Sequence, residues 1–329
     1  MLIITAEKMK KLLPMKEAIE AVKEAYKMVS EGKCYVPLRT NISAERHGGQ
    51  ILFMPGYVDG IGFAGVKIVS VYPENAKKGL PSVPATMVLI DGTTGIVKAV
   101  MDGTYLTRLR TGAASGAATE LLAKKDAKKA ILFGTGGQAR EQLWALLSVR
   151  KLEEVYVCSR DFEKAKEFAG RMSREFEDYG AKITAVEKAD GVLSEVDIIT
   201  TATTSRTPVF DGSLVKKGVH INAIGSFTPE MQELPEEVVL KADRVFVDSR
   251  EACLAEAGDL IVPMKKGLMG EEKITGEIGE VLLGKIRGRT SEDEITIFKS
   301  VGIAVQDIVT AAKIYEKAVE QGLGSNLEI

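Results

Sequence analysis

The chain has 329 residues, of which 45% are hydrophobic and 27% charged, enough material to bury two domain-sized cores. Its formal net charge of -2 argues against nucleic-acid or membrane partners, and no apolar run reaches the roughly 20 residues of a membrane span. The three cysteines are widely spaced, which argues against a disulfide framework, so we expect a cytoplasmic protein. With only two histidines as well, the chain has few residues that could bind a metal, and we expect none.

The first third of the chain predicts a small α+β domain. Residues 16–31 carry apolar side chains at helical spacing and are followed by Gly32, which is typical of an amphipathic helix. Short β-rich runs then predict a sheet, with expected strands at 51–54, 63–72, 87–90 and 96–101 and a hairpin loop at 91–95. The segment 105–123, rich in Ala and Leu and without proline, predicts a long helix that leads into the next domain.

From residue 129 onward, β-rich and helical patterns alternate. The expected strands are 130–133, 155–158, 183–186, 197–202, 219–224 and 244–248. Because such alternation is typical of parallel strands joined by crossover helices, we expect an α/β fold with a Rossmann-type doubly wound parallel sheet. A further helix is expected at 304–321, where apolar residues again follow helical spacing.

A glycine-rich turn follows the first of these strands. The sequence Gly134-Thr135-Gly136-Gly137-Gln138-Ala139 stands between a hydrophobic strand and a helix, the context that a dinucleotide-binding turn requires. We expect Gly134 to permit the tight turn, Gly136 to let the backbone approach a pyrophosphate, and Ala139 to replace the third glycine. A turn that only reverses the chain is the weaker alternative. The sequence therefore predicts an enzyme that uses a nicotinamide dinucleotide.

The second strand of the doubly wound sheet leads into Ser159 and Arg160. NAD-preferring sites usually carry an acid there, which bonds the ribose 2′-hydroxyl, and this chain has none. Because Ser159 and Arg160 can instead donate to a 2′-phosphate, we expect NADPH or NADH as cofactor, with NADPH favoured. In the alternative, Arg160 snorkels or stacks on the adenine, which is compatible with NADH.

Three cations of the first domain lie beside apolar residues and outside solvated charge runs, namely Arg39, Lys67 and Arg110. Together they can clamp a carboxylate. Taken singly, each also fits the end of a half-buried element, and the pattern alone does not decide between the two. A partly buried lysine between cations has a lowered pKa, so we hypothesise that Lys67 also acts as an acid through water.

The sequence resembles the ornithine cyclodeaminase/μ-crystallin family along nearly its whole length. The segments that carry the resemblance occur in the order of the family's motifs. They are Gly65-Val66-Lys67, Tyr72-Pro73-Glu74-Asn75, Lys78-Gly79-Leu80-Pro81, Thr107-Arg108-Leu109-Arg110-Thr111-Gly112-Ala113-Ala114-Ser115, the glycine-rich turn, Asn222-Ala223-Ile224-Gly225 and Phe298-Lys299-Ser300-Val301-Gly302.

The resemblance implies a homodimer built from a substrate-binding and dimerisation domain, 1–118 with 301–329, and a dinucleotide-binding Rossmann domain, 119–300. It implies that Lys67 and Arg110 are the catalytic pair that holds a substrate carboxylate beside the nicotinamide. The other positions assigned to the substrate are Arg39, Met54, Phe227, Val301 and Gly302. The positions assigned to the cofactor are Ser82, Arg110, Thr111, Gly134, Gly136, Gln138, Ala139, Ser159, Arg160, Thr201, Thr203, Ala223 and Ser300.

One departure from the family's pattern bears on the reaction. In the cyclodeaminases and in the alanine dehydrogenase of the family, an Asp that handles the amine follows Asn-Ala-(Val/Ile)-Gly, and this chain has Phe227 at that position. Without that carboxylate, deamination of an amino acid or addition of ammonia to a keto acid lacks its proton shuttle. Thr228 and Glu230 are alternative replacements, although as neighbours of Pro229 they fit loop positions better.

Reduction of a preformed cyclic ketimine asks less, because a protonated C=N bond is already an electrophile and Phe227 can pack against the ring. We therefore expect reduction of Δ1-pyrroline-2-carboxylate to L-proline, or of Δ1-piperideine-2-carboxylate to L-pipecolate, with NADPH or NADH. Alanine dehydrogenase and ornithine cyclodeaminase activities are the alternatives. A non-catalytic, NADPH-dependent binding protein is a weaker one, because it needs neither Lys67 nor Arg110. His220 lies in an expected buried strand and is predicted to be packed, not catalytic.

Overall fold

The computed structural model describes residues 1–328, with every side chain except that of Ala76. The chain divides into two compact units, which are described separately. Unit 1 consists of Met1–Arg110 and Gly302–Ile329, and unit 2 is Thr111–Val301. None of the helices in the described part of the chain is long and apolar enough to cross a membrane.

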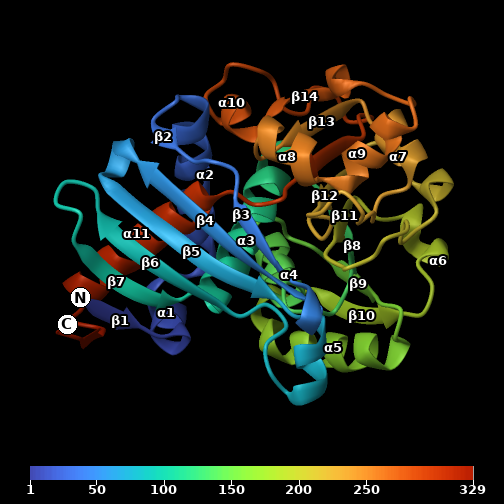
Figure 1. Ribbon diagram of the computed structural model, residues 1–329. Coiled ribbons are helices and arrows are strands. Elements are labelled where there is room, and N and C mark those ends of the chain that lie inside the picture. The colour runs from blue at the N-terminus through green and yellow to red at the C-terminus, as the bar shows by residue number, and fades with distance from the viewer. Residues whose placement is uncertain (329) are drawn as a thin grey trace. The chain divides into compact units, whose positions relative to one another are not determined.

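Unit 1 is built on an eight-stranded sheet in the order β16-β1-β7-β6-β5-β4-β2, with β3 also paired to β4 (Figure 1). All its pairs are antiparallel except that of β1 with β7. Its strands are β1 Leu2–Ile4, β2 Cys34–Tyr35, β3 Thr40–Ala44, β4 Gly49–Val58, β5 Phe63–Val71, β6 Ala85–Asp91, β7 Val97–Asp102 and β16 Ser325–Asn326. Its helices are α1 Ala6–Leu12, α2 Met15–Ser30 and α11 Ala304–Glu320.

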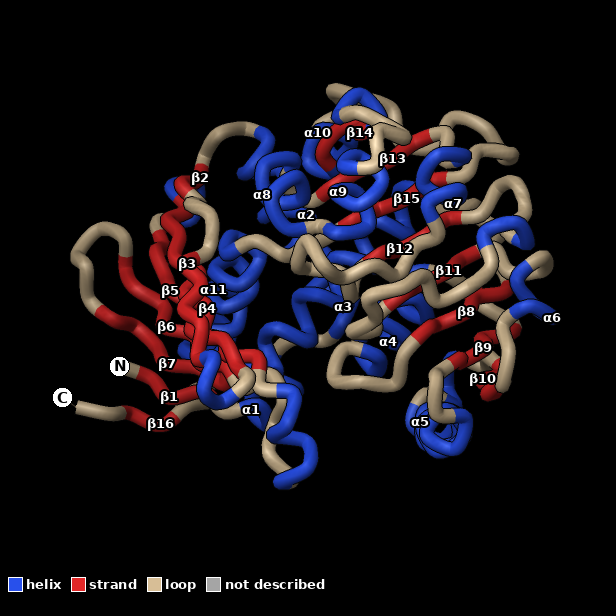
Figure 2. Tube along the Cα trace, turned by 45° about the vertical axis from the view of Figure 1, so that its right-hand side comes forward, coloured by secondary structure: helices blue, strands red, loops and turns tan. Residues whose placement is uncertain are grey.

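Helices α2 and α11 lie on one side of this sheet (Figure 2). The predicted helices 16–31 and 304–321 are thereby confirmed to within a residue at each end. Side chains on β5 alternate, because Gly65, Lys67 and Val69 are buried toward α11 whereas Ile68 is 37% exposed on the opposite face. The buried face therefore receives Lys67, a cation among apolar neighbours.

Strands β4 and β6 are longer than the apolar runs predicted at 51–54 and 87–90, whereas β5 and β7 match the predicted runs 63–72 and 96–101 to within a residue at each end. The run at 51–54 was expected to end before Pro55 and Gly56, yet β4 continues to Val58. Pro55 is tolerated because it lies between the stretches of β4 that pair with β3 and with β2, so its missing N–H leaves no bond unmade on that edge. Strands β1, β2, β3 and β16 were not predicted, since they are short or carry mostly exposed polar residues.

Unit 2 contains an eight-stranded sheet in the order β10-β9-β8-β11-β12-β15-β13-β14, and every neighbouring pair is parallel. Its strands are β8 Lys129–Phe133, β9 Glu154–Cys158, β10 Lys182–Val186, β11 Ile198–Thr201, β12 His220–Ala223, β13 Arg244–Val247, β14 Ile274–Glu277 and β15 Thr296–Lys299. The predicted doubly wound α/β fold is confirmed. Strands β14 and β15 were missed, because each has only four residues and includes a Gly, Glu or Lys.

The helices of unit 2 are α4 Ala139–Val149, α5 Phe162–Glu175, α6 Asp190–Leu193, α7 Glu236–Lys241, α8 Arg250–Glu256, α9 Gly258–Lys265 and α10 Ile278–Leu282. Strand order reverses at β8, whose neighbours are β9 on one side and β11 on the other. In open α/β sheets, ligands bind beyond the carboxyl ends of the strands at such a switch point. We therefore expect a ligand to bind at the segment after Phe133.

Helix α3, Gly103–Leu122, matches the predicted helix 105–123, and the division between the units falls inside it. The sequence placed this division after residue 118, whereas it lies between Arg110 and Thr111. The difference has a packing cause. A Cβ on Gly112 would clash with the carbonyl oxygen of Glu141 in α4, so α3 joins the core of unit 2 almost from Thr111 onward. The second division lies before Gly302, one residue later than expected.

Candidate active site

A buried ion cluster forms on the helix-covered face of the unit 1 sheet. The Lys67 ammonium lies 2.9 and 2.8 Å from the two carboxylate oxygens of Asp307, which comes from α11. Both side chains are 1% exposed. The carboxylate also accepts a hydrogen bond from Nε of Arg110 in α3, at 3.0 Å. One acid from α11 therefore joins the two cations that the sequence assigned to a substrate carboxylate.

Arg110 is held by further contacts. Its Nη1 donates to the Gln306 side-chain oxygen at 3.0 Å, and the Gln306 amide nitrogen donates to the Tyr26 hydroxyl at 2.7 Å. Nη2 of Arg110 has no protein hydrogen-bond partner in residues 1–328, although Arg110 is only 5% exposed. The guanidinium is thus fixed by two of its nitrogens, and the third, Nη2, is left without a partner among the described residues.

Gly302 shapes the space beside Arg110. Its φ of 79° lies in the left-handed region, and an added Cβ would overlap Nη1 of Arg110. The Gly302 carbonyl accepts a hydrogen bond of 2.7 Å from Nη2 of Arg39. Arg39, Lys67, Arg110 and Gly302, four of the predicted substrate-site residues, are therefore brought to one place.

Met54 belongs to the same face of the sheet, because it is directly opposite Lys67 in the register of β4 and β5 and is 3% exposed. Ser82, by contrast, is half-buried in the segment before β6, where its carbonyl accepts a hydrogen bond of 2.8 Å from the Tyr72 N–H. The cofactor role assigned to Ser82 stays a prediction.

The environment of Lys67 favours its neutral form. Burial, together with the positive charges of Arg110 and Arg39, lowers the pKa of Lys67 to about 7, and Asp307 opposes that shift. The lowered pKa that the sequence suggested is confirmed. Lys67 can therefore give up and regain a proton near neutral pH.

In unit 2 the glycine-rich turn has the geometry that the motif predicts. Gly134 has a φ of 105°, and a Cβ there would lie 2.6 Å from the carbonyl oxygen of Ala202, just beyond β11. Nothing lies within 4 Å of a Cβ built on Gly136 or Gly137. The turn thus packs closely on one side and leaves open space on the other.

The residues after this turn suit an anionic ligand. Helix α4 begins at Ala139, and its N-cap residue, Gln138, forms no side-chain capping bond. The Gln138 side-chain oxygen is buried and has no protein partner among the described residues. Free N–H groups at the start of a helix, next to an open glycine turn, fit a pyrophosphate.

At the end of β9, Ser159 is half-buried and Arg160 is exposed. The next residue, Asp161, is an acid, but it caps α5 by accepting a hydrogen bond of 3.2 Å from the Lys164 N–H. Its carboxylate is therefore engaged in the helix, in agreement with the absence of a ribose-binding acid from the sequence pattern.

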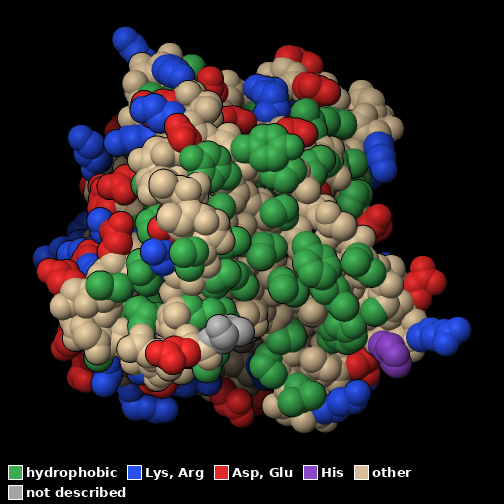
Figure 3. All heavy atoms as spheres, turned by 60° about the vertical axis from the view of Figure 1, so that its left-hand side comes forward, with side chains coloured by type: hydrophobic (Ala, Val, Ile, Leu, Met, Phe, Trp, Pro, Cys, Tyr) green, Lys and Arg blue, Asp and Glu red, His purple; other side chains and the backbone are tan. Residues whose placement is uncertain are grey.

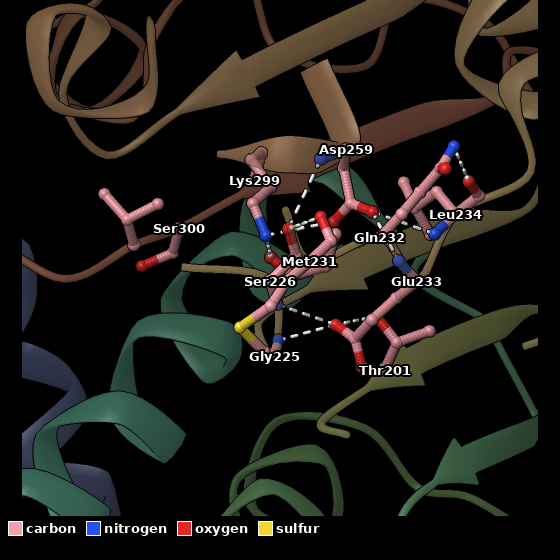
Figure 4. Close-up of polar contacts among 12 residues, drawn as sticks. Thr201, Gly225, Ser226, Met231, Gln232, Glu233, Leu234, Asp259, Lys299 and Ser300 are labelled. Carbon is pink, nitrogen blue, oxygen red and sulfur yellow. Dashed lines mark hydrogen bonds and ion pairs between the residues drawn. The ribbon is translucent and has the colours of Figure 1, made fainter. Parts of the chain in front are cut away.

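A second buried network joins the loops that follow β11 and β12 (Figure 4). The Glu233 carboxylate accepts hydrogen bonds from the Thr201 hydroxyl at 2.9 Å and from the N–H groups of Thr203 and Gly225, both at 2.6 Å. The Ser226 N–H donates to the same carboxylate at 3.1 Å. Burial and the charge of Asp259 raise the pKa of Glu233.

Asp259 in α9 holds the backbone at Glu233 in place. It accepts hydrogen bonds from the N–H groups of Glu233 and Leu234, at 2.7 and 2.9 Å, and pairs with Lys299 at 3.1 Å. Lys299 in turn donates to the Ala223 carbonyl at 3.1 Å. The predicted cofactor positions Thr201, Thr203 and Ala223 are therefore tied together by one buried network.

The loop after β12 carries Phe227, which is half-buried. Glu230, which the sequence offered as a replacement acid, is exposed, and Thr228 is half-buried. The buried acid of this segment is Glu233, three residues beyond Glu230. Its four accepted hydrogen bonds give it a structural task in holding the loop.

Ser300 follows β15, where it is 2% exposed and donates its hydroxyl to Asp248 at 2.7 Å. The Val301 N–H donates to the same Asp248 oxygen at 3.0 Å. Thr111 is 7% exposed in α3. The cofactor and substrate roles assigned to Thr111, Ser300 and Val301 remain predictions.

His220 is fully buried in β12, as predicted. Its ring nitrogens lie 3.0 Å from the Thr296 hydroxyl and 3.1 Å from the Asn222 side-chain oxygen. Burial and the charge of Arg289 lower the pKa of His220 to about 3. The ring is therefore neutral at ordinary pH and forms part of the packing.

The sequence patterns did not reveal Asp307, Gln306, Glu233, Asp259 or Lys299 as parts of these networks. For Asp307 a signal was present. Gln306 and Asp307 stand inside a run of apolar residues, Ala304–Ala312, on a helix expected to be packed, and a carboxylate in such a position requires a buried cation.

Comparisons with known proteins agree with these observations. A model of the ornithine cyclodeaminase/mu-crystallin family matches residues 1–322. A Delta(1)-pyrroline-2-carboxylate reductase of Bacillus cereus is 42% identical over 328 residues, which cover 100% of each chain.

Two solved structures have nearly the same fold. The Thermococcus litoralis Delta(1)-pyrroline-2-carboxylate reductase, in complex with NADH and L-proline, superposes with a TM-score of 0.95 at 46% identity, covering 99% of this chain and 100% of that chain. An archaeal alanine dehydrogenase dimer with bound NAD gives a TM-score of 0.91 at 39% identity, covering 100% and 99%. The resemblance read from the motifs is thus confirmed, and the chain belongs to the ornithine cyclodeaminase/mu-crystallin family.

Proposed function

We propose that this chain reduces a cyclic ketimine, Δ1-pyrroline-2-carboxylate, to L-proline with a reduced nicotinamide dinucleotide. The observation that carries the proposal is the pair of buried cations, Lys67 and Arg110, that shares a single buried acid, Asp307, and leaves Nη2 of Arg110 without a partner among the described residues. The Lys67 ammonium and the Arg110 guanidinium together exceed the single negative charge of Asp307, and the carboxylate of a substrate neutralises this excess. The reductases from Bacillus cereus and Thermococcus litoralis support this choice of substrate.

Within this proposal, unit 1 binds the substrate and unit 2 binds the cofactor. The open side of Gly136 and Gly137 and the N–H groups at the start of α4 are the features that fit the pyrophosphate. A bound nicotinamide supplies the hydride. The cofactor is NAD(H) or its phosphorylated form, and the two solved relatives have NADH and NAD bound. We further propose a preference for NADPH, because Arg160 is exposed and Asp161 is engaged in capping α5.

The side chains of unit 1 have separate tasks in the reaction. Nη2 of Arg110, together with Arg39, binds the substrate carboxylate and orients the ring. Lys67 gives one proton from its ammonium to the imine nitrogen, the imine carbon accepts the hydride, and Lys67 then regains a proton from solvent. The C=N bond is thus converted to CH–NH, and one reduced cofactor is oxidised per turnover. The packing of Phe227, a residue of unit 2, against the ring stays a prediction.

We propose that the working form is a homodimer in the cytoplasm. The sheet face opposite α2 and α11 carries a patch of apolar side chains, which gather in the middle of the view in Figure 3. Ile42 and Ile68, at 51% and 37% exposure, lie on it with the half-buried Ile51, Phe53 and Val66. Such a patch favours association with a second copy, and the archaeal relative is a dimer. Cys34, Cys158 and Cys253 form no disulfide within residues 1–328, which fits a reducing compartment.

The proposal is tested by offering the purified protein NADPH and NADH with four substrates: pyrroline-2-carboxylate, piperideine-2-carboxylate, pyruvate with ammonia, and ornithine. Nicotinamide absorbance and ammonia are followed. We expect oxidation of the cofactor in step with pyrroline-2-carboxylate consumption. Because the archaeal alanine dehydrogenase is 39% identical, that activity is the second candidate. Turnover confined to pyruvate with ammonia, or to ornithine, would overturn the proposal.

A further inference from the structure

We propose that Asp307 is a positioning residue of the reductase site, which holds the Lys67 ammonium against Arg110 and keeps Lys67 charged until it gives up its proton. This inference rests on the proposed function and extends it to a residue of α11. The reaction needs a proton donor that is charged although it is buried beside other cations. Asp307 is the buried carboxylate in contact with that donor.

The geometry allows little freedom. One oxygen of Asp307 accepts from both Lys67, at 2.9 Å, and Arg110, at 3.0 Å, while the other accepts from Lys67 at 2.8 Å. Asp307 and Lys67 are each 1% exposed, and Arg110 is 5% exposed. The carboxylate therefore bridges the two cations from the α11 side and leaves Nη2 of Arg110 to a ligand.

The charge balance gives Asp307 a second effect. The groups that face Lys67 are Arg110 from α3, Arg39 from the segment before β3, and Asp307 from α11. Burial and the two arginines favour the neutral amine, whereas Asp307 favours the ammonium. Without the negative charge of Asp307, Lys67 is neutral at the pH where the enzyme works and has no proton to give.

Because of Gln306, the effect of the Asp307 charge can be tested without a large change in the shape of the site. It holds Nη1 of Arg110 and the Tyr26 hydroxyl, so Arg110 keeps a partner when Asp307 loses its charge. Asp307→Asn preserves side-chain volume and one oxygen acceptor. It therefore removes the charge with a small change of packing.

The test is the pH dependence of kcat with pyrroline-2-carboxylate for the full-length wild type, Asp307→Asn and Asp307→Glu. For the wild type we expect kcat to fall as the pH rises through about 7, where Lys67 loses its proton. Because Asp307 raises the pKa of Lys67, Asp307→Asn moves this fall to lower pH by about one to three units. Asp307→Glu keeps the charge and leaves the midpoint near that of the wild type, even where kcat is lower.

The matched control is Glu316→Gln, which removes the same charge from an exposed position of α11 and leaves the profile unchanged. Cofactor affinity, measured by nicotinamide fluorescence, stays within about twofold in all variants, since α11 belongs to unit 1. A wild-type profile in Asp307→Asn overturns the inference. If Asp307→Asn does not fold, a wild-type kcat without ionisation between about pH 6 and 9 overturns it equally. Absence of reductase activity in the wild type instead contradicts the proposed function.

Discussion

Gly302 and Arg110 are in such close contact that a single methyl group on Gly302 would overlap Nη1 of the guanidinium. We expect Gly302→Ala to displace Arg110 and to lower kcat/KM by about tenfold or more, since misplacement of a binding group by about 1 Å has effects of that order. Steady-state kinetics measure the loss.

Gly322→Ala is the matched control for Gly302→Ala. Gly322 also has a positive φ, 64°, but nothing lies within 4 Å of its Cβ. Both variants carry the backbone strain of alanine in the left-handed region, about 1 kcal/mol or more, and only Gly302→Ala affects Arg110. Equal kinetics in the two variants would contradict the role given to Gly302.

Two variants of the glycine-rich turn are expected to differ in their effects on folding and on cofactor binding. Gly134→Ala combines a φ of 105° with an approach of 2.6 Å to the Ala202 carbonyl, so we expect both lower thermal stability and weaker cofactor binding. A Cβ on Gly136 meets only open space, so in Gly136→Ala the melting temperature is retained while cofactor affinity falls by about tenfold or more. Melting curves and fluorescence titrations check both. If Gly136→Ala retained its affinity for the cofactor, the pyrophosphate would not bind at this turn.

Arg160 is expected to determine the preference for NADPH. Because one charge-assisted hydrogen bond contributes about 1.5 to 3 kcal/mol, Arg160→Ser raises the KM for NADPH by about tenfold or more and changes that for NADH little. Lys151→Ser, in the segment before β9, also removes an exposed positive charge and serves as the control. Equal changes for both cofactors would indicate that Arg160 stacks on the adenine.

His220 makes stability depend on pH. Its pKa is about 3 in the folded chain, against 6.5 for an unperturbed histidine, so the unfolded state binds more protons between these values. The contribution of His220 to stability is therefore present above pH 6.5 and is lost as the pH falls toward 3, by about 1.4 kcal/mol per pH unit. Urea unfolding of His220→Gln shows a flatter acid dependence than the wild type. His47→Gln, at an exposed position, keeps the wild-type slope.

The apolar sheet face gives a prediction about assembly. Ile68→Asp places a charge in the middle of the patch and is expected to shift the protein toward monomer in sedimentation velocity. Ile96→Asp is the control, since Ile96 is 60% exposed in the turn before β7 and outside the patch. A dimer that survives Ile68→Asp unchanged must use another surface.

The sequence predicted those features that depend on neighbouring residues. The helices α2 and α11, the glycine-rich turn and most strands of unit 2 follow from local periodicity and from turn chemistry. Asp307 could not be paired with Lys67 in this way, because 240 residues separate them and only the packing of α11 on β5 joins them. Likewise, Glu233 is three residues from Glu230 in an irregular segment, and no periodicity distinguishes the buried acid from the exposed one.

The return of α11 to the sheet of unit 1 has a consequence during synthesis. Unit 2 is one continuous stretch of chain, whereas unit 1 is interrupted by it. On the ribosome, the strand that bears Lys67 therefore emerges long before the helix that bears Asp307. Until α11 arrives, β5 holds a lysine without its counter-ion and an uncovered apolar face, so we expect unit 2 to complete its fold before unit 1.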